Sequence, residues 1–320
     1  MGYNSKRVYK GAAHTEYFLT VGQQVLILFV LIACGYLLGR GRVIGDTGAK
    51  AMSDVTLLLA SPCVIALSFE REFSWSVMQE LGTALLLGVL IHLVAIGLAQ
   101  VMYCHDAPRD RVLRMATVLS NAGFMGLPLQ QAVLGEQGVF YGAAYVTAFN
   151  LTLWTYGLMT MDRSSKRISA RKILINPGVI GLAAGVIILV LPVQLPPLIR
   201  TPISHLAALN TPLPMVFIGY SLSKVNLGKI LRDKTYYLAC AVRLLLVPTI
   251  VIGVLYLAGI RDVLLLSMAI SASAPVAAAV SMFAGKYEQD TERAVNLVAL
   301  STVFSVITMP LFVSLVKLIA

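Results

Sequence analysis

Long apolar stretches alternate with short polar ones along the whole chain. Runs of about 20 mostly hydrophobic residues recur, and each is long enough to cross about 30 Å of hydrocarbon as an α-helix. Short clusters of Gly, Pro and charged residues separate these runs. The pattern predicts an all-α membrane protein with ten transmembrane helices, at 19–39, 50–69, 77–103, 111–134, 139–160, 173–192, 198–223, 235–258, 262–284 and 290–318.

The longest polar connection, at 161–172, divides the chain near its centre. We therefore predict an N-terminal extramembrane segment (1–18), a first group of five helices (19–160), a central cytoplasmic loop (161–172) and a second group of five (173–320). No separate water-soluble domain is expected.

Prolines and glycines recur at a near-constant offset between the two groups. The matched pairs are Pro62 with Pro212, Pro128 with Pro275, and Gly135 with Gly285, at offsets of 150, 147 and 150 residues. Because each group has an odd number of helices, the second would enter the membrane from the opposite side. The sequence thus predicts two inverted five-helix repeats, an arrangement typical of secondary transporters.

Composition and charge agree with a membrane location. Of 320 residues, 58% are hydrophobic and 12% charged, whereas a soluble domain usually carries about a quarter charged residues. If both termini lie outside, the inward loops hold 17 Lys and Arg residues and the outward segments 7. Basic residues favour the cytoplasmic side. We expect a multi-pass protein of the bacterial plasma membrane with both termini outside, whose net charge of +10 requires no nucleic-acid partner.

The segment "SNAGFMGLPLQQAVLG" (Ser120–Gly135) places Asn, Gly and Pro inside predicted helix 4. A proline removes one backbone donor, and free backbone groups in lipid are tolerated only inside protein or along a wet cavity. Breaks at Pro128 in helix 4 and Pro275 in helix 9 predict two unwound segments that cross near the midplane. Their half-helix N-termini would favour an anion. The alternative is that these residues only kink the helices or permit close packing.

Several polar side chains are candidates for a substrate site at this crossing. Asn121 offers a donor and an acceptor, and three serines add hydroxyl groups. Arg243, about eight residues into helix 8, would pair with a carboxylate or attract an anion, or else extend to the surface. Asn210 would line the site or cap a freed backbone group. The candidate set is Ser120, Asn121, Pro128, Asn210, Arg243, Ser271, Ser273 and Pro275.

Two further residues are candidates for proton coupling. Asp54 lies near the predicted cytoplasmic start of helix 2, where it could equally pair with a basic loop. His92 in helix 3 could relay protons or simply pack and form hydrogen bonds. Neither crossover contains an acidic residue, so proton coupling or uniport is expected rather than sodium coupling.

Four stretches resemble the auxin efflux carrier family, which includes bacterial malate and malonate permeases. They are "CGYLLGRGRVI", "SNAGFMGLPL", "INPGVIGLAAG" and "SAPVAAAVSMFAGKYEQD" with the following "LSTVFSVITMPL". The resemblance implies ten helices in an inverted repeat, proline crossovers in helices 4 and 9, and transport of small organic acids. It also implies that Asn121 contacts the substrate carboxylate. Bacterial relatives often have Asn where this chain has Ala279.

These observations predict a secondary transporter of small organic anions, mono- or dicarboxylates. It would work by alternating access, with helices 3–5 and 8–10 moving against a scaffold of helices 1, 2, 6 and 7. A channel or a transporter-like receptor is the alternative. No HExxH, GxSxG, Walker or zinc-spaced motif is found, so we expect no enzyme activity, cofactor or metal. Besides substrate and membrane lipid, a homodimer is expected through a GxxxG face at Gly35 and Gly39.

Overall fold

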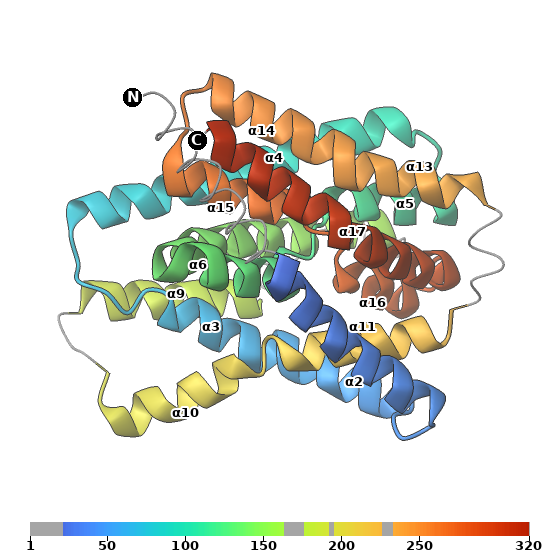
Figure 1. The fold of residues 1–320 in the computed structure, drawn as a ribbon, viewed down its shortest axis with the longest axis horizontal. Coiled ribbons are helices and arrows are strands. Elements are labelled where there is room, and N and C mark those ends of the chain that lie inside the picture. The colour runs from blue at the N-terminus through green and yellow to red at the C-terminus, as the bar shows by residue number, and fades with distance from the viewer. Residues whose placement is uncertain (1–21, 163–175, 192–194, 226–232, 320) are drawn as a thin grey trace, which may run out of the picture.

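The protein is described by a computed structural model that covers residues 22–162, 176–191, 195–225 and 233–319 (Figure 1). Within these ranges the regular structure is entirely helical, and the single β-type contact is an isolated antiparallel bridge between Ser120 and Val276. The all-α prediction is therefore confirmed. The predicted 1–18 segment and most of the 161–172 loop lie outside the described residues.

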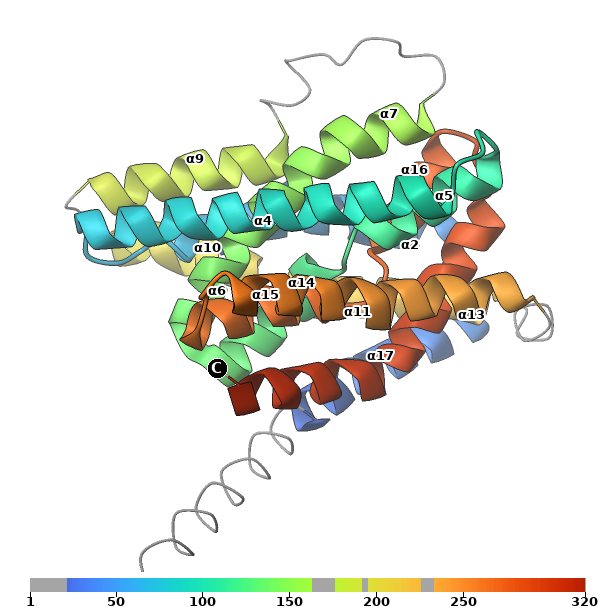
Figure 2. The same cartoon turned by 90° about the horizontal axis from the view of Figure 1, so that it is seen from above.

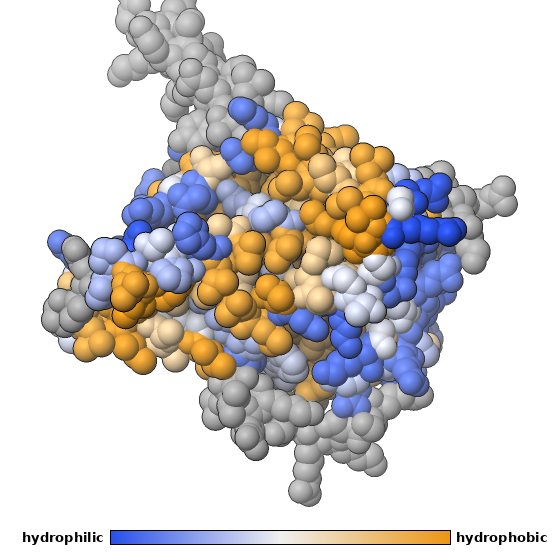
Figure 3. All heavy atoms as spheres, turned by 90° about the horizontal axis from the view of Figure 1, so that it is seen from below, coloured by the Kyte–Doolittle hydropathy of each residue, from blue (hydrophilic) through white to orange (hydrophobic). Residues whose placement is uncertain are grey.

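Five helical stretches among the described residues are apolar and long enough to cross a membrane. They are Gly22–Arg40, Asp46–Leu67, Trp75–Met102, Lys234–Leu257 and Thr291–Ile319. Large apolar side chains on them face outward, among them Leu257 (86% exposed) and Val101 (82% exposed). Figure 3 shows hydrophobic side chains gathered across the middle of one face, with hydrophilic ones on both sides of them. Exposed apolar surface of this extent marks an integral membrane protein.

The helices are built from the following elements, in which η denotes a π-helical turn. After the first helix (Gly22–Arg40) come α2 (Asp46–Val55), η1 (Thr56–Ala60), α3 (Ser61–Leu67), α4 (Trp75–Met102), α5 (Pro108–Val118), η2 (Ala122–Gly126), α6 (Leu127–Thr152), η3 (Leu153–Gly157) and α7 (Leu158–Met161). Then follow α9 (Pro177–Val190), α10 (Pro197–Ala208), α11 (Pro212–Ser223), α13 (Lys234–Ala241), η4 (Val242–Leu246), α14 (Val247–Leu257), α15 (Asp262–Ser273), α16 (Ala278–Lys286) and α17 (Thr291–Ile319).

Helix starts follow ordinary capping chemistry. The side chains of Ser74, Asn176 and Asp233 accept hydrogen bonds from the backbone N–H groups that open α4, α9 and α13. Prolines occupy the first turns of α5, α9, α10 and α11, where the missing N–H has no helical partner to lose. Polar and proline residues thus set the starts of these helices. The predicted helix at 198–223 is two helices, α10 and α11, and α6 continues through the predicted connection at 135–138 with a kink at Gly135.

The helices form two groups that are separate in Figure 1. The scaffold group contains the first helix, α2, η1, α3, α9, α10 and α11, in which α3 packs on α9 and α10, and α2 on α11. The crossing group contains α4 to α7 and α13 to α17, in which α6 packs on α4 and α15, and α17 on α13, α15 and α16 (Figure 2). The two groups meet where α6 contacts α9 and where α11 contacts α17.

The Gly35–Gly39 face packs inside the chain. A Cβ atom at Gly35 would overlap the backbone oxygen of Val216 on α11, and one at Gly39 would overlap the hydroxyl of Ser223 at the end of α11. The small residues allow two backbones of the same molecule to approach closely, as they do in membrane helix pairs. The expectation that this face holds a second copy is therefore wrong, and a homodimer stays a prediction without this interface.

Candidate functional site

Two unwound segments cross inside the crossing group. α5 ends at Val118 and helix resumes at Ala122, while α15 ends at Ser273 and α16 begins at Ala278. Both segments lie near the centre of Figure 2.

The segments pair with each other as a two-bond antiparallel bridge. The Asn121 N–H donates to Pro275 O (2.7 Å), and the Ala277 N–H donates to Leu119 O (3.0 Å). The Val276 N–H donates to Ser301 Oγ on α17 (3.1 Å). Unwound backbone deep in a membrane protein needs such partners.

The prolines lie differently from the prediction. Pro275 is in the second break, as expected, but Pro128 lies in the first turn of α6. The first break is at 119–121, and the helix that follows opens with η2, in which Met125 N and Gly126 N both donate to Asn121 O (3.0 and 3.3 Å). Pro128 therefore does not form the crossing, because helix has already restarted before it. This part of the predicted crossover is wrong.

Asn121 is a polar side chain at the crossing with an unpaired hydrogen-bond donor. It is 2% exposed, and its Nδ2 has no hydrogen-bond partner among the residues that the structure describes. A buried donor without a partner costs about 1–3 kcal/mol, so such groups in native proteins call for a specific reason. A ligand acceptor at this position is one.

A small cavity lies directly beside the Asn121 side chain. Its volume is about 30 Å³, and its walls come from both helix groups: Asn121, Phe149 and Asn150 from the crossing group, and Leu57, Ser61 and Gly178 from the scaffold. This space holds about one or two water molecules. We call it the crossing cavity; it is partly open, and the buried Asn121 side chain forms part of its wall.

Two helix N-termini also border the crossing cavity. Gly123 belongs to η2, which continues into α6, and Ala278 and Ala279 open α16. The first N–H groups of a helix have no intrahelical acceptor, and the helix dipole places about half a positive charge there. Together with the Asn121 amide they form a surface suited to an anion.

Arg243 is buried deep in the crossing group, with 1% of its surface exposed. Its Nη2 donates to Ala272 O (2.6 Å) and Ala274 O (3.1 Å), its Nε to Ala274 O (3.2 Å), and its Nη1 to Thr117 O (3.1 Å). It therefore neither reaches the surface nor pairs with a carboxylate of the described residues. Its partners are the carbonyls that end α15 and α5.

The predicted serines divide into one that lines the cavity and two that do not. Ser120 lines the crossing cavity and lies 3.2 Å from Tyr145 Oη. Ser271 accepts from Gln130 Nε2 (2.9 Å), and Ser273 donates to Ile270 O (3.2 Å) in its own helix. Ser271 therefore links α15 to α6 and Ser273 bonds within α15, and neither lines the cavity.

Asn210 lies in the break between α10 and α11. Its Nδ2 donates to Gly123 O (3.1 Å), and its Oδ1 accepts from Ser61 Oγ (2.8 Å). It thus caps a backbone carbonyl of η2 from the scaffold side, which is the second of the two roles considered for it. This contact joins the two helix groups next to the crossing cavity.

Of the two proton-coupling candidates, only His92 lies near the crossing. His92 is buried, with Nδ1 2.7 Å from Gly88 O, Nε2 unpartnered and its ring centroid 5.0 Å from that of Tyr145. Tyr145 in turn contacts Ser120. Asp54 is exposed on α2 and does not line the crossing cavity.

Sequence reasoning missed two buried amides. Gln130 is fully buried and joins α6 to α15, because it accepts from Ser267 Oγ (2.8 Å) and donates to Ser271 Oγ. Asn150 lines the crossing cavity and donates to Val146 O (2.9 Å). Both are polar residues inside apolar helical stretches, and that alone was a usable signal.

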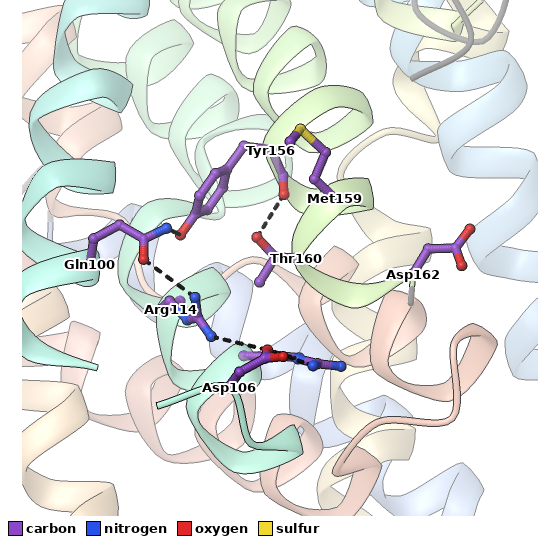
Figure 4. A pocket seen from close by; sticks show the side chains of 8 residues that line it. Gln100, Asp106, Arg114, Tyr156, Met159, Thr160 and Asp162 are labelled. Atoms are coloured by element: carbon purple, nitrogen blue, oxygen red, sulfur yellow. Dashed lines mark hydrogen bonds and ion pairs between the residues drawn. The ribbon is translucent and has the colours of Figure 1, made fainter. Parts of the chain in front are cut away.

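A second cavity of about 430 Å³ lies at the ends of α4, α5 and α7 (Figure 4). It is lined by Asp106, Arg111, Arg114 and Asp162 among others. Asp106 accepts from Arg111 Nε (2.8 Å) and lies 3.8 Å from Arg114 Nη2. Two arginines and two aspartates balance in charge, so this cavity shows no preference for an anion.

Comparison with known proteins gives a match over nearly the whole chain. A family model described as "Membrane transport protein" matches residues 20–313. An uncharacterized transporter of Methanothermobacter thermautotrophicus is 24% identical over 314 residues, covering 92% of this chain and 98% of the relative. An uncharacterized transporter of Methanocaldococcus jannaschii is 22% identical over 306 residues, covering 90% and 96%.

Proposed function

The chain belongs to the membrane transport protein family, the auxin efflux carriers that its motifs resemble, and on that premise we propose that it is a secondary transporter of small organic anions. The observation that carries this proposal is the Asn121 amide, which has no hydrogen-bond partner among the described residues and lies beside two helix N-termini in a cavity between two helix groups. A carboxylate would satisfy the amide and interact with both dipoles.

The walls of the crossing cavity suggest the substrate class. Phe124, Val146 and Phe149 supply apolar surface. The polar side chains are the hydroxyls of Ser61 and Ser120 and the amides of Asn121 and Asn150. A site with one polar end and an apolar wall suits a small acid with a hydrocarbon body. We propose a mono- or dicarboxylate that contacts Asn121 through one carboxylate.

Alternating access is the proposed mechanism. The crossing cavity lies between the two helix groups, so sliding of the crossing group against the scaffold would open it to one side and then the other. Contacts between the groups include Gly178 on α9, where a Cβ atom would overlap Asn150. Because Gly178 has no side chain, no side chain of that residue interlocks with Asn150 to oppose sliding of the two helix groups.

The finer topology is part of the same proposal. We propose ten membrane crossings arranged as two inverted five-helix repeats, in a bacterial plasma membrane with both termini outside. Movement with a proton or as uniport is proposed, and His92 is the better placed of the two proton-coupling candidates.

Counterflow in proteoliposomes tests the function. Purified protein is reconstituted with unlabelled malate, malonate, acetate or an indole carboxylate inside, and uptake of the same labelled acid is followed. A carrier gives saturable uptake that is accelerated by internal substrate. Uptake without saturation or exchange would indicate a channel, and binding without uptake would indicate a receptor.

The acids to reconstitute are chosen by a thermal-unfolding screen in detergent. A ligand that binds only the folded protein raises its unfolding midpoint with concentration. Carboxylates, indoles and amino acids are compared, and an amine of equal size serves as the control for non-specific effects.

A further inference from the structure

Arg243 is held where two interrupted helices end. Thr117 belongs to the last turn of α5, Ala272 to the last turn of α15, and Ala274 follows α15 directly. The last carbonyls of a helix have no intrahelical donor. The Arg243 guanidinium donates four hydrogen bonds to three of these carbonyls. The carbonyls belong to the ends of two helices, α5 and α15, that are far apart in the sequence.

The charges at this point balance without a carboxylate. Each helix C-terminus carries about half a negative charge, so α5 and α15 together offer about −1 to one guanidinium. Among the described residues Arg243 forms no ion pair, whereas Arg111, the other buried arginine, pairs with Asp106. A buried cation without such compensation is strongly unfavourable.

In carriers with broken helices, unwound carbonyls and half-helix C-terminal ends bind the coupling cation. In this chain the same kind of carbonyl set is filled by a side chain. We infer that Arg243 is a resident cation: a positioning residue that occupies the place of a coupling ion, locks the two breaks together and leaves only the N-terminal, positive side of the crossing open to ligand. The comparison with a coupling ion rests on the proposed transport function, whereas the stabilising role of Arg243 does not.

The role differs from the substrate contact that the sequence suggested for Arg243. A substrate-binding arginine would matter little to the empty protein, whereas a resident cation holds the empty protein together. It also makes the empty protein indifferent to the alkali cation in the buffer. Both properties can be measured without a substrate.

The test is thermal unfolding of the full-length, ligand-free protein in detergent, in NaCl, KCl or choline chloride of equal ionic strength. Wild type is expected to unfold at the same temperature in all three salts. Arg243→Gln is expected to unfold at a temperature lower by roughly 5 °C or more in choline, with part of the loss recovered in NaCl or on addition of methylguanidinium. Arg243→Lys, which keeps the charge, is expected to lose less and to stay indifferent to the salt.

Arg111→Gln is the matched control, because it removes a buried arginine whose charge is already paired, and it is expected to show no dependence on the cation. Sodium-specific stabilisation of wild type would overturn the inference. So would wild-type stability of Arg243→Gln in choline, or an equal loss in the Lys and Gln variants. Should Arg243→Gln not fold, the wild-type and Lys measurements decide. A protein that proved to be a channel or a receptor would give the same result here, so the two proposals fail separately.

Discussion

Asn121 and Arg243 lie at the same crossing but differ in how their hydrogen-bond donors are satisfied. Arg243 donates to carbonyl oxygens through each of its guanidinium nitrogens, whereas the Asn121 Nδ2 has no acceptor among the described residues. The first arrangement stabilises the fold, and the second costs free energy until a ligand arrives. The distinction separates a structural residue from a binding residue at the level of single hydrogen bonds.

Replacing Asn121 with Ala should abolish binding and uptake without destabilising the protein. The Nδ2 group makes no hydrogen bond in the empty protein, so its removal leaves no partner unsatisfied. The measurements are the unfolding midpoint with and without the best acid from the screen, and counterflow. Full counterflow in this variant would exclude Asn121 from the site.

Asn296→Ala is the control for that variant. Asn296 is also a buried amide, but its Nδ2 donates to Tyr236 Oη (3.1 Å), and it does not line the crossing cavity. The loss of that bond should lower stability by about 1 kcal/mol while the ligand-induced shift persists.

At residue scale the sequence led to Asn121 and Ser120 but not to the partners of Arg243. Asn121 stands out because it is an amide inside an apolar stretch and is followed by Gly123, Gly126 and Pro128. Backbone carbonyls, by contrast, belong to every residue, and nothing in the sequence marks the three that Arg243 contacts. The depth of Arg243 left two alternatives open, burial in the bundle and extension to the surface, and the structure shows burial.

At the scale of elements, the breaks were predicted in the right helices and misplaced in one of them. Pro275 stands in its break, whereas the first break precedes Pro128 and contains no proline. A proline disfavours helical backbone at the residue before it, so a helix often ends there. A proline also fits the first turn of a new helix. Only the pairing of 119–121 with 275–277 decides between these roles, and that pairing is a tertiary contact.

Gly135 marks a sharp change of direction inside α6. Its φ of 65° and ψ of −152° lie in a region that is almost exclusive to glycine. Gly135→Ala should therefore destabilise the protein by about 1–3 kcal/mol, although a Cβ there would meet no atom within 4 Å. Thermal or denaturant unfolding measures the loss.

Gly253→Ala in α14 is its matched control. Its added Cβ would also meet nothing within 4 Å, and the residue lies in a regular helix. Alanine is expected to stabilise there by about 0.5–1 kcal/mol. Equal effects at Gly135 and Gly253 would contradict the strain argument.

Asp233 caps α13 outside the membrane-spanning segment and gives stability a dependence on pH. The Thr235 hydroxyl and N–H, followed by Arg293, lower the pKa of the Asp233 carboxyl below its ordinary value of 3.8. Because the folded-state pKa is depressed, the stabilisation is complete above the ordinary value and is lost as pH falls through the lowered one.

Asp233→Asn should therefore unfold at a lower temperature than wild type near neutral pH. The difference should shrink as pH falls below about 4. Midpoints measured across that range check the expectation, and a difference that is constant with pH would show that the carboxylate charge plays no part.

For the whole molecule, the packing of the first helix on α11 fixes the scaffold. Gly35→Ala would push a Cβ into the backbone of Val216, so the two helices must separate. We expect a loss of about 1–3 kcal/mol and no change in the mass of the particle measured by light scattering. Gly97→Ala in α4, where a Cβ meets nothing within 4 Å, should leave the particle mass unchanged and, like Gly253→Ala, stabilise the protein by about 0.5–1 kcal/mol.

Dissociation of a larger species by Gly35→Ala would restore the idea of a dimer through this face. The sequence could not distinguish the two cases. A GxxxG pair promotes close packing but does not say whether the partner helix belongs to the same chain. The all-helical membrane fold, by contrast, follows from the apolar runs alone.

The balance of charge around Arg243 bears on what drives transport. A helix dipole has no net charge, so the guanidinium leaves the empty crossing with about +1, and a bound monocarboxylate brings the loaded crossing to about zero. One turnover of uniport export therefore moves one negative charge outward. A membrane potential of 100 mV, negative inside, is worth about 2.3 kcal/mol for one charge, which equals an outward gradient of roughly 50-fold. In uniport, voltage alone would then power the export of an acid and a current should accompany every turnover, whereas co-export of one proton would abolish that current.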